Sequence, residues 1–182
     1  MNETDGLRPR NPLDWIGKRY LSWTAYGLLL LVCSLVQFAP HLFEIGGAKP
    51  MLFIPAVVCI AMHTGPAGGL AAGAIAGFGW DIFSGGLLGL YGLLLMLIGT
   101  ACGLLTWLLV RNNELSALLM CAAAALVFTL TVWGLTYVLM QREQPFFVLW
   151  AEYLPDWLYT AVVSPIIYQA TRFCARILRR RQ

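Results

Sequence analysis

Two histidines and five cysteines are the residues of this sequence best suited to metal binding or nucleophilic catalysis, and their spacing favours neither. His41 and His63 stand apart from each other and from any candidate nucleophile. Zinc sites need clustered thiolates or imidazoles, and covalent catalysis needs a nucleophile beside its base. We therefore expect no metal, no cofactor and no catalytic centre. The cysteines are interpreted as free thiols, because each lies in an apolar run and none forms a CxxC pair: Cys33, Cys59, Cys102, Cys121 and Cys174.

Asp81 is the acidic residue whose setting most invites a functional role, because it follows a glycine-rich apolar run. An ionisable side chain inside a membrane is costly and is a functional candidate by default. No second acid lies within a helical turn of Asp81, so the sequence does not indicate a proton relay. Three structural roles remain open: a solvated carboxylate near the membrane surface, an acceptor for the backbone at residues 84–86, or a cap for the following helix. We expect Asp81 and Ser84 to form a structural turn.

The composition indicates what surrounds these residues. Of the 182 residues, 59% are hydrophobic and 12% are charged, whereas soluble domains are about 25% charged. A water-soluble chain of this length could not hide so much apolar surface, since a large share of a small protein stays at its surface. We therefore predict an integral membrane protein of the all-α class, a bundle of about six transmembrane helices.

Six apolar runs are the candidate spans. They cover residues 20–39, 51–62, 66–80, 87–110, 115–140 and 157–174. The second and third runs are short for a hydrocarbon core about 30 Å thick, since a helix rises about 1.5 Å per residue. These two form either two short spans or a re-entrant hairpin. Pro165 is expected to kink the last helix, and Pro55 the second helix unless it lies in the first turn.

The distribution of lysine and arginine predicts the orientation of the bundle. With six spans and both termini inside, ten of the 12 basic residues lie on the inner side, whereas five spans would leave seven of them outside. We therefore expect a cytoplasmic segment 1–19, a transmembrane bundle 20–175 and a basic cytoplasmic tail 176–182. Seven basic residues are assigned to topology and lipid headgroups: Lys18, Arg19, Arg111, Arg176, Arg179, Arg180 and Arg181.

Glycines are concentrated in one part of the chain, with 12 of the 18 between residues 65 and 103. Stripes of small residues let two helix backbones approach closely, which favours association inside a membrane. The two stripes are expected to pack against each other or against a partner protein. The first recurs every four residues and the second at spacings of three, four or seven: Gly65, Gly69, Gly73 and Gly77, then Gly85, Gly89, Gly92, Gly99 and Gly103.

Several segments in the middle and at the end of the chain resemble the MreD family of bacterial rod-shape-determining membrane proteins. The family pattern is a glycine-rich helix, an aspartate, a short glycine-containing turn and then Leu-Gly before a hydrophobic residue. The matching stretches are Pro55, Gly69–Phe78, Trp80–Gly85 and Leu88–Leu90, followed by Leu154-Pro155, Tyr159–Ala161, Ser164-Pro165, Tyr168 and a basic tail. One departure is Phe78-Gly79-Trp80, where the family often has a leucine-rich segment.

The resemblance implies a non-enzymatic scaffold of the rod complex, or elongasome, in the bacterial cytoplasmic membrane. Its implied partners are MreC, the MreB filament, the RodA glycosyltransferase and a penicillin-binding transpeptidase, with membrane lipids around it and no nucleic acid. Together these direct lateral peptidoglycan synthesis and maintain cell shape. The implied fold resembles the six-helix substrate-binding component of energy-coupling-factor vitamin transporters.

Two other functions are weighed against the scaffold. A vitamin-binding transporter subunit usually carries small residues four apart in its first helix, where this chain has mostly leucine and valine between Gly27 and Phe38. An intramembrane enzyme would need polar side chains converging on one cavity, and the sequence shows no such set. The scaffold is therefore the expected function, and the transporter subunit is the alternative.

Overall fold

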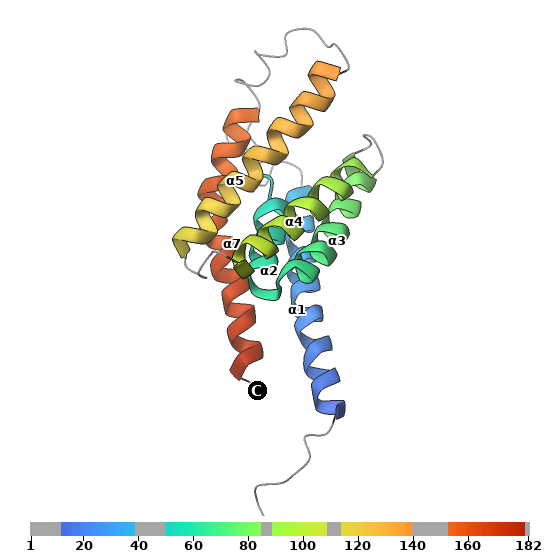
Figure 1. Cartoon of the computed structure of the whole chain (residues 1–182), viewed down its shortest axis with the longest axis vertical. Coiled ribbons are helices and arrows are strands. Elements are labelled where there is room, and N and C mark those ends of the chain that lie inside the picture. The colour runs from blue at the N-terminus through green and yellow to red at the C-terminus, as the bar shows by residue number, and fades with distance from the viewer. Residues whose placement is uncertain (1–11, 39–49, 85–88, 109–113, 140–152, 181–182) are drawn as a thin grey trace, which may run out of the picture.

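The computed structural model describes residues 12–38, 50–84, 89–108, 114–139 and 153–180, and these residues are helical apart from short turns. Figure 1 shows the helices packed side by side as a bundle. No strand occurs in these ranges, so the predicted all-α class is confirmed there. The helices are α1 (Pro12–Phe38), α2 (Phe53–Thr64), α3 (Pro66–Ser84), α4 (Leu90–Leu108), α5 (Glu114–Trp133) with its π-helical continuation η1 (Gly134–Leu139), and α7 (Leu154–Arg180).

Several helices are longer than the apolar runs that predicted them. The helix α1 begins eight residues before the expected span, and α3 continues past residue 80 to Ser84. The helical backbone thus crosses the boundaries predicted at residues 19 and 175. The first turn of α1 and the last turn of α7 lie at the same end of the molecule (Figure 1), as an even number of crossings requires. The cytoplasmic placement of both ends stays a prediction.

Two helices in the described part of the chain are long and apolar enough to cross a membrane, Leu90–Leu108 and Glu114–Thr136. The segments Trp23–Phe38 and Phe53–Thr64 are apolar but shorter. Large hydrophobic side chains are exposed on α1, α3, α4, α5 and α7, and none is exposed on α2. A surface of this kind is stable against lipid tails and costly against water. The count of six spans stays a prediction.

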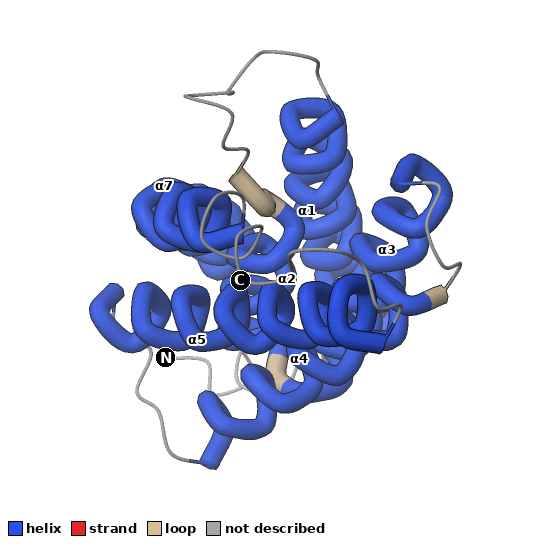
Figure 2. The backbone as a smooth tube through the Cα atoms, turned by 90° about the horizontal axis from the view of Figure 1, so that it is seen from above, coloured by secondary structure: helices blue, strands red, loops and turns tan. Residues whose placement is uncertain are grey.

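The short helix α2 is the centre of the bundle. It contacts α1, α3, α4, α5 and α7 (Figure 2). Every residue from Phe53 to Met62 is buried. A helix that is hydrophobic on all sides is stable only when other elements cover every face. Residues 53–62 of α2 have this composition, and the five surrounding helices supply the cover.

The start of α2 is held by side chains of its neighbours. The backbone N–H of Phe53 donates to Oε1 of Gln37 on α1 at 3.2 Å, and that of Met51 donates to Oγ1 of Thr160 on α7 at 2.9 Å. The first backbone N–H groups of a helix have no acceptor within it. These two bonds therefore give acceptors to N–H groups that the helix itself leaves without one. Pro55 is the third residue of α2. It lies in the first turn, where a missing N–H removes no helical hydrogen bond, so the structure gives no cause for a kink there.

Candidate functional site: a glycine-packed helical hairpin

The helices α3 and α4 form an antiparallel hairpin whose backbones touch. A Cβ atom added at Gly69 would overlap the carbonyl oxygen of Gly99, and one added at Gly99 would overlap the carbonyl of Gly69. The next contacts follow in antiparallel order: a Cβ at Gly73 would meet the backbone of Leu95, and one at Gly77 the Cα of Gly92. The two stripes therefore face each other along the length of the hairpin.

The last glycine of the second stripe packs against the turn between α2 and α3. A Cβ at Gly103 would lie 2.7 Å from the backbone of Gly65 and Pro66. Gly65 itself has a positive φ of 79°, which a side chain would strain. Gly103 is thus part of the intramolecular contact, and Gly65 forms the turn. Dispersion between such close backbones favours helix association where the hydrophobic effect is missing.

One described member of the second stripe, Gly89, differs from the rest. Gly89 has φ +92° and nothing within 4 Å of an added Cβ, so it is required for the backbone conformation before α4 and not for packing. Gly85 lies outside the described residues. A partner-contact role for the glycines stays a prediction, and the described members other than Gly89 are already used within the chain.

Asp81 lies at the end of this hairpin where the chain passes from α3 to α4. It lies inside α3, one turn before the end, and its side chain is only 3% exposed. Its carboxylate accepts two backbone hydrogen bonds from α4, from Tyr91 N–H to Oδ1 at 3.1 Å and from Gly92 N–H to Oδ2 at 2.9 Å. Both donors belong to the first turn of α4, which also carries the positive end of the helix dipole. Of the three roles left open by the sequence, the structure shows the cap of the following helix.

The residues next to Asp81 make this cap fit. A Cβ at Gly92 would lie 3.1 Å from Oδ2 of Asp81, so glycine leaves the carboxylate room to approach. Ser84 is the last residue of α3 and is exposed. The turn predicted at Asp81 and Ser84 would include residues 85 and 86, which lie outside the described ranges, so it stays a prediction.

An aromatic cluster surrounds Trp80 beside the cap. The Trp80 ring stacks on Tyr91 at a centroid distance of 5.4 Å and on Phe128 at 5.2 Å. The cluster connects five helices and consists of Phe38, Phe53, Trp80, Phe83, Tyr91 and Phe128. This cluster was not predicted from the sequence, and Trp80 drew attention only as a departure from the family pattern. The sequence did contain an indication of this cluster, because the aromatic residues Trp80 and Tyr91 lie on either side of Asp81 and the segment that follows it.

The helices α5 and α7 are joined by polar side chains. The indole N–H of Trp157 donates to the carbonyl of Ala122 at 2.9 Å. Arg172 and Glu114 form an ion pair at 2.7 Å, with 41% and 63% of their side chains exposed. Each bond links residues far apart in sequence, so together they fix one helix along the other.

Within α7, Ser164 donates the hydrogen bond that Pro165 cannot make. Proline has no backbone N–H, so Pro165 cannot bond to the carbonyl four residues earlier, that of Ala161. The hydroxyl of Ser164 donates to this same carbonyl at 2.8 Å. A freed carbonyl inside an apolar bundle is costly, and the serine supplies its partner. The kink predicted at Pro165 stays a prediction.

The described residues contain no group of three His, Cys, Asp or Glu side chains that could hold a metal ion. All five cysteines are free thiols, and the sulfurs of Cys59 and Cys121 approach to 4.0 Å. His63 donates through Nδ1 to the carbonyl of Cys59 at 2.8 Å.

The basic residues predicted to meet lipid headgroups fall mainly at the ends of the long helices. Lys18 and Arg19 are in the first half of α1, and Arg176, Arg179 and Arg180 are in the last turns of α7. Only their helical backbone is described. Arg111 and Arg181 lie outside the described residues, and the headgroup role of all seven stays a prediction.

The fold and the hairpin define an all-helical protein with two candidate membrane spans in its described part, built around close backbone packing, with a buried carboxylate used as a helix cap. Comparison with protein families identifies it further. The family model described as rod shape-determining protein MreD matches residues 18–174. The chain therefore belongs to the MreD family, as the sequence resemblance indicated, and this membership assigns it to rod-shape determination in bacteria. No curated protein and no solved structure matches the chain.

Proposed function

We propose that this chain is a non-enzymatic scaffold of the rod complex in the bacterial cytoplasmic membrane, coupling MreC to the cell-wall synthases. RodA, the penicillin-binding transpeptidase and MreB belong to the same larger assembly. The proposal also includes six membrane spans with both termini in the cytoplasm. It includes a fold like that of the substrate-binding component of vitamin transporters. Family membership over residues 18–174 is its first support.

The observation that carries the proposal is the two-sided character of α3. One face holds Gly69, Gly73 and Gly77 against α4. The other face exposes Leu70, Ile75, Phe78 and Ile82 by 44 to 73%. Backbone contact fixes the hairpin, so its outward apolar face has a defined shape. A rigid apolar face is suited to binding transmembrane helices of partner proteins, and it needs no catalytic group.

A matched pair of variants tests the proposal in a rod-shaped host lacking the gene. Gly73→Leu with Gly77→Leu should force α3 and α4 apart, whereas Gly79→Leu adds the same side chain where nothing lies within 4 Å. We expect the double variant to lose rod shape and co-purification of MreC, and Gly79→Leu to keep both. Membrane abundance of each variant is measured by immunoblot, so that loss of protein is separated from loss of function.

The scaffold proposal fails if the wild-type chain does not co-purify with MreC in mild detergent, or if the double variant keeps both rod shape and MreC. Calorimetry with vitamins tests the transporter alternative directly. Tight binding of a vitamin by the wild-type chain would replace the scaffold with that alternative.

A further inference from the structure

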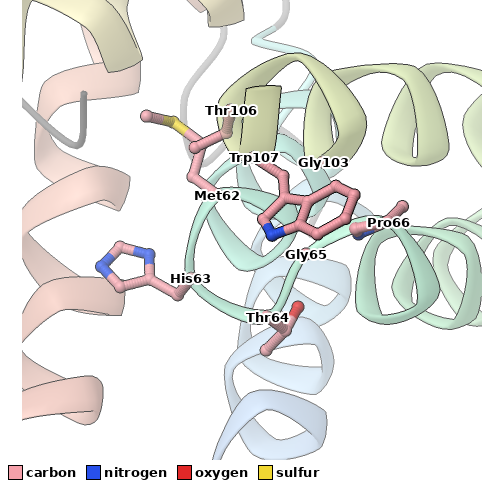
Figure 3. Close-up of a pocket in the computed structure, with 8 residues that line it drawn as sticks. All are labelled: Met62, His63, Thr64, Gly65, Pro66, Gly103, Thr106 and Trp107. Carbon is pink, nitrogen blue, oxygen red and sulfur yellow. The ribbon is translucent and has the colours of Figure 1, made fainter. Parts of the chain in front are cut away.

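A pocket of about 540 Å³ lies where α2 ends, α3 begins and α4 ends (Figure 3). This size falls within the range of small-molecule and cofactor sites, about 300–1,000 Å³. The pocket borders the contact of Gly103 with Gly65 and Pro66 and lies apart from the Asp81 cap. The pocket is lined by Met62, His63, Thr64, Gly65, Pro66, Gly103, Thr106 and Trp107.

The polar groups of the pocket have fixed hydrogen-bonding roles. The hydroxyls of Thr64 and Thr106 donate to carbonyls of their own helices, at 2.7 Å to Ile60 and 2.8 Å to Cys102. They present only acceptor lone pairs to a ligand. The indole N–H of Trp107 is a donor, and no described residue is its acceptor. Apart from the titratable His63, none of the eight lining residues carries a charge.

The position along α4 places the pocket near a membrane surface. The helix α4 is a candidate span, and Trp107 is its next-to-last residue, 75% exposed. Tryptophan favours the level where hydrocarbon meets headgroups. The last two turns of α4 also expose Leu104, Leu105 and Leu108. The rim of the pocket therefore continues into a surface that faces lipid tails.

The short length of α2 explains why the space exists. At about 1.5 Å per residue its 12 residues rise about 18 Å, well under the hydrocarbon thickness of about 30 Å. The chain then turns at Gly65 and α3 leads away. The region beyond the end of α2 is bounded by α4 and by the turn itself, and no described helix fills it.

We propose that the pocket binds one membrane phospholipid through its glycerol-ester region and the adjoining part of one acyl chain. The indole N–H of Trp107 donates to an ester carbonyl, which is an acceptor only. The acyl chain lies against Met62, Pro66 and the Trp107 ring. Because the lining has no fixed charge, the headgroup is not selected. The inference depends on the membrane setting and not on the scaffold role.

Native mass spectrometry of the full-length chain in mild detergent tests this proposal. The probe is an equimolar mixture of phosphatidylglycerol and phosphatidylethanolamine. We expect the wild type to retain one phospholipid, of either headgroup within about twofold of equal occupancy, since no Asp, Glu, Lys or Arg lines the pocket. Trp107→Ala should lower retention about tenfold. Trp107→Phe, which keeps a ring and loses the N–H, should lower it about threefold, the effect of one neutral hydrogen bond.

Leu108→Ala is the matched control, because Leu108 is exposed on the same helical turn and does not line the pocket. It should retain phospholipid as the wild type does. Equal retention by Trp107→Ala and the wild type, or a wild type that retains none, would overturn the proposal. Tenfold selection of phosphatidylglycerol over phosphatidylethanolamine would do so too, since it requires a charged site.

A second measurement uses only the wild-type chain, so it does not depend on the folding of a variant. A phospholipid with a photoreactive diazirine in its acyl chain is incorporated, illuminated, and mapped by peptide mass spectrometry. Labelling should concentrate on residues 62–66 and 106–107. Labelling spread equally over exposed residues elsewhere, such as Leu28, Ile75 and Leu130, would show only general lipid contact and would contradict a site.

Discussion

The α3–α4 hairpin and the α5–α7 pair show two different ways to hold helices together without a hydrophobic driving force. In the hairpin, backbone touches backbone through glycines, so Gly69 and Gly99 leave no room for a Cβ. In the α5–α7 pair, long polar side chains connect the helices, through Trp157 to Ala122 and Arg172 to Glu114. The first contact depends on the absence of side chains and the second on their presence. The two regions should therefore respond oppositely to changes in side-chain size.

The largest effect is expected from Gly77→Ala in the hairpin. The new methyl group would meet the Cα of Gly92, and neither backbone can move without separating the helices. We expect a loss of about 3 kcal/mol in the free energy of unfolding, typical of severe overpacking. Thermal or denaturant unfolding in detergent measures it. Gly79→Ala is the control, because nothing lies near its added Cβ. Equal destabilisation by Gly77→Ala and Gly79→Ala would show that close backbone packing does not distinguish the α3–α4 hairpin from the α5–α7 pair.

Asp81→Ala should be next in size. It leaves the backbone N–H groups of Tyr91 and Gly92 without their acceptor in a buried site. Unsatisfied buried groups cost about 1–3 kcal/mol each, and a relaxed structure should lose about 2–3 kcal/mol in total. Amide hydrogen exchange should rise first in the opening turn of α4. Ser84→Ala, at an exposed position, should change neither measurement, and unchanged exchange in Asp81→Ala would contradict the capping role.

Removal of the Ser164 hydroxyl probes α7 itself. Ser164→Ala should cost about 1 kcal/mol, because the Ala161 carbonyl freed by Pro165 loses its donor. The double variant Ser164→Ala/Pro165→Ala should recover the loss, since the new alanine supplies a backbone N–H to that carbonyl. Unfolding in detergent measures all variants. If the double variant were no more stable than Ser164→Ala, the Ser164 hydroxyl would not be compensating for the N–H that Pro165 lacks.

The smallest effect is expected at the ion pair between α5 and α7. Both side chains of the Arg172–Glu114 pair are substantially exposed, and such pairs contribute about 0.5 kcal/mol. Glu114→Gln should lower the unfolding free energy by no more than this, and high salt should reduce the wild type to the same value. A loss as large as that of Gly77→Ala would show that this exposed ion pair stabilises the α5–α7 pair as strongly as backbone packing stabilises the hairpin, which contradicts the expected ranking.

The sequence predicted the packing face of the hairpin better than its ends. Four-residue spacing places Gly69, Gly73 and Gly77 on one side of any helix, so a close contact followed from periodicity alone. The acceptor role of Asp81 toward Tyr91 and Gly92 did not follow. It depends on how the chain turns between α3 and α4, which sets the register of the two helices and is not encoded in any local pattern.

The central place of α2 was also beyond local reasoning. Its composition showed a short apolar run, which fits a short span, a re-entrant segment or a buried core helix alike. Its central place involves contacts with distant helices: Gln37 of α1 accepts from Phe53, the first residue of α2, and Thr160 of α7 accepts from Met51 just before it. Pairings across such distances follow from the arrangement of all the helices. Whether residues 51–80 form two spans or a re-entrant hairpin stays a prediction. The π-helical segment η1 gave no sequence signal that we recognised.

The bond from Met51 to Thr160 joins groups 109 residues apart, and this separation has a consequence for biosynthesis. A ribosome adding about 5–20 residues per second needs on the order of ten seconds to reach the second group after the first. Throughout that interval the amide of Met51 has no acceptor from α7 in a low-dielectric surrounding. The start of α2 therefore lacks this anchor until translation is almost finished, and a chain ending before residue 160 would never form it.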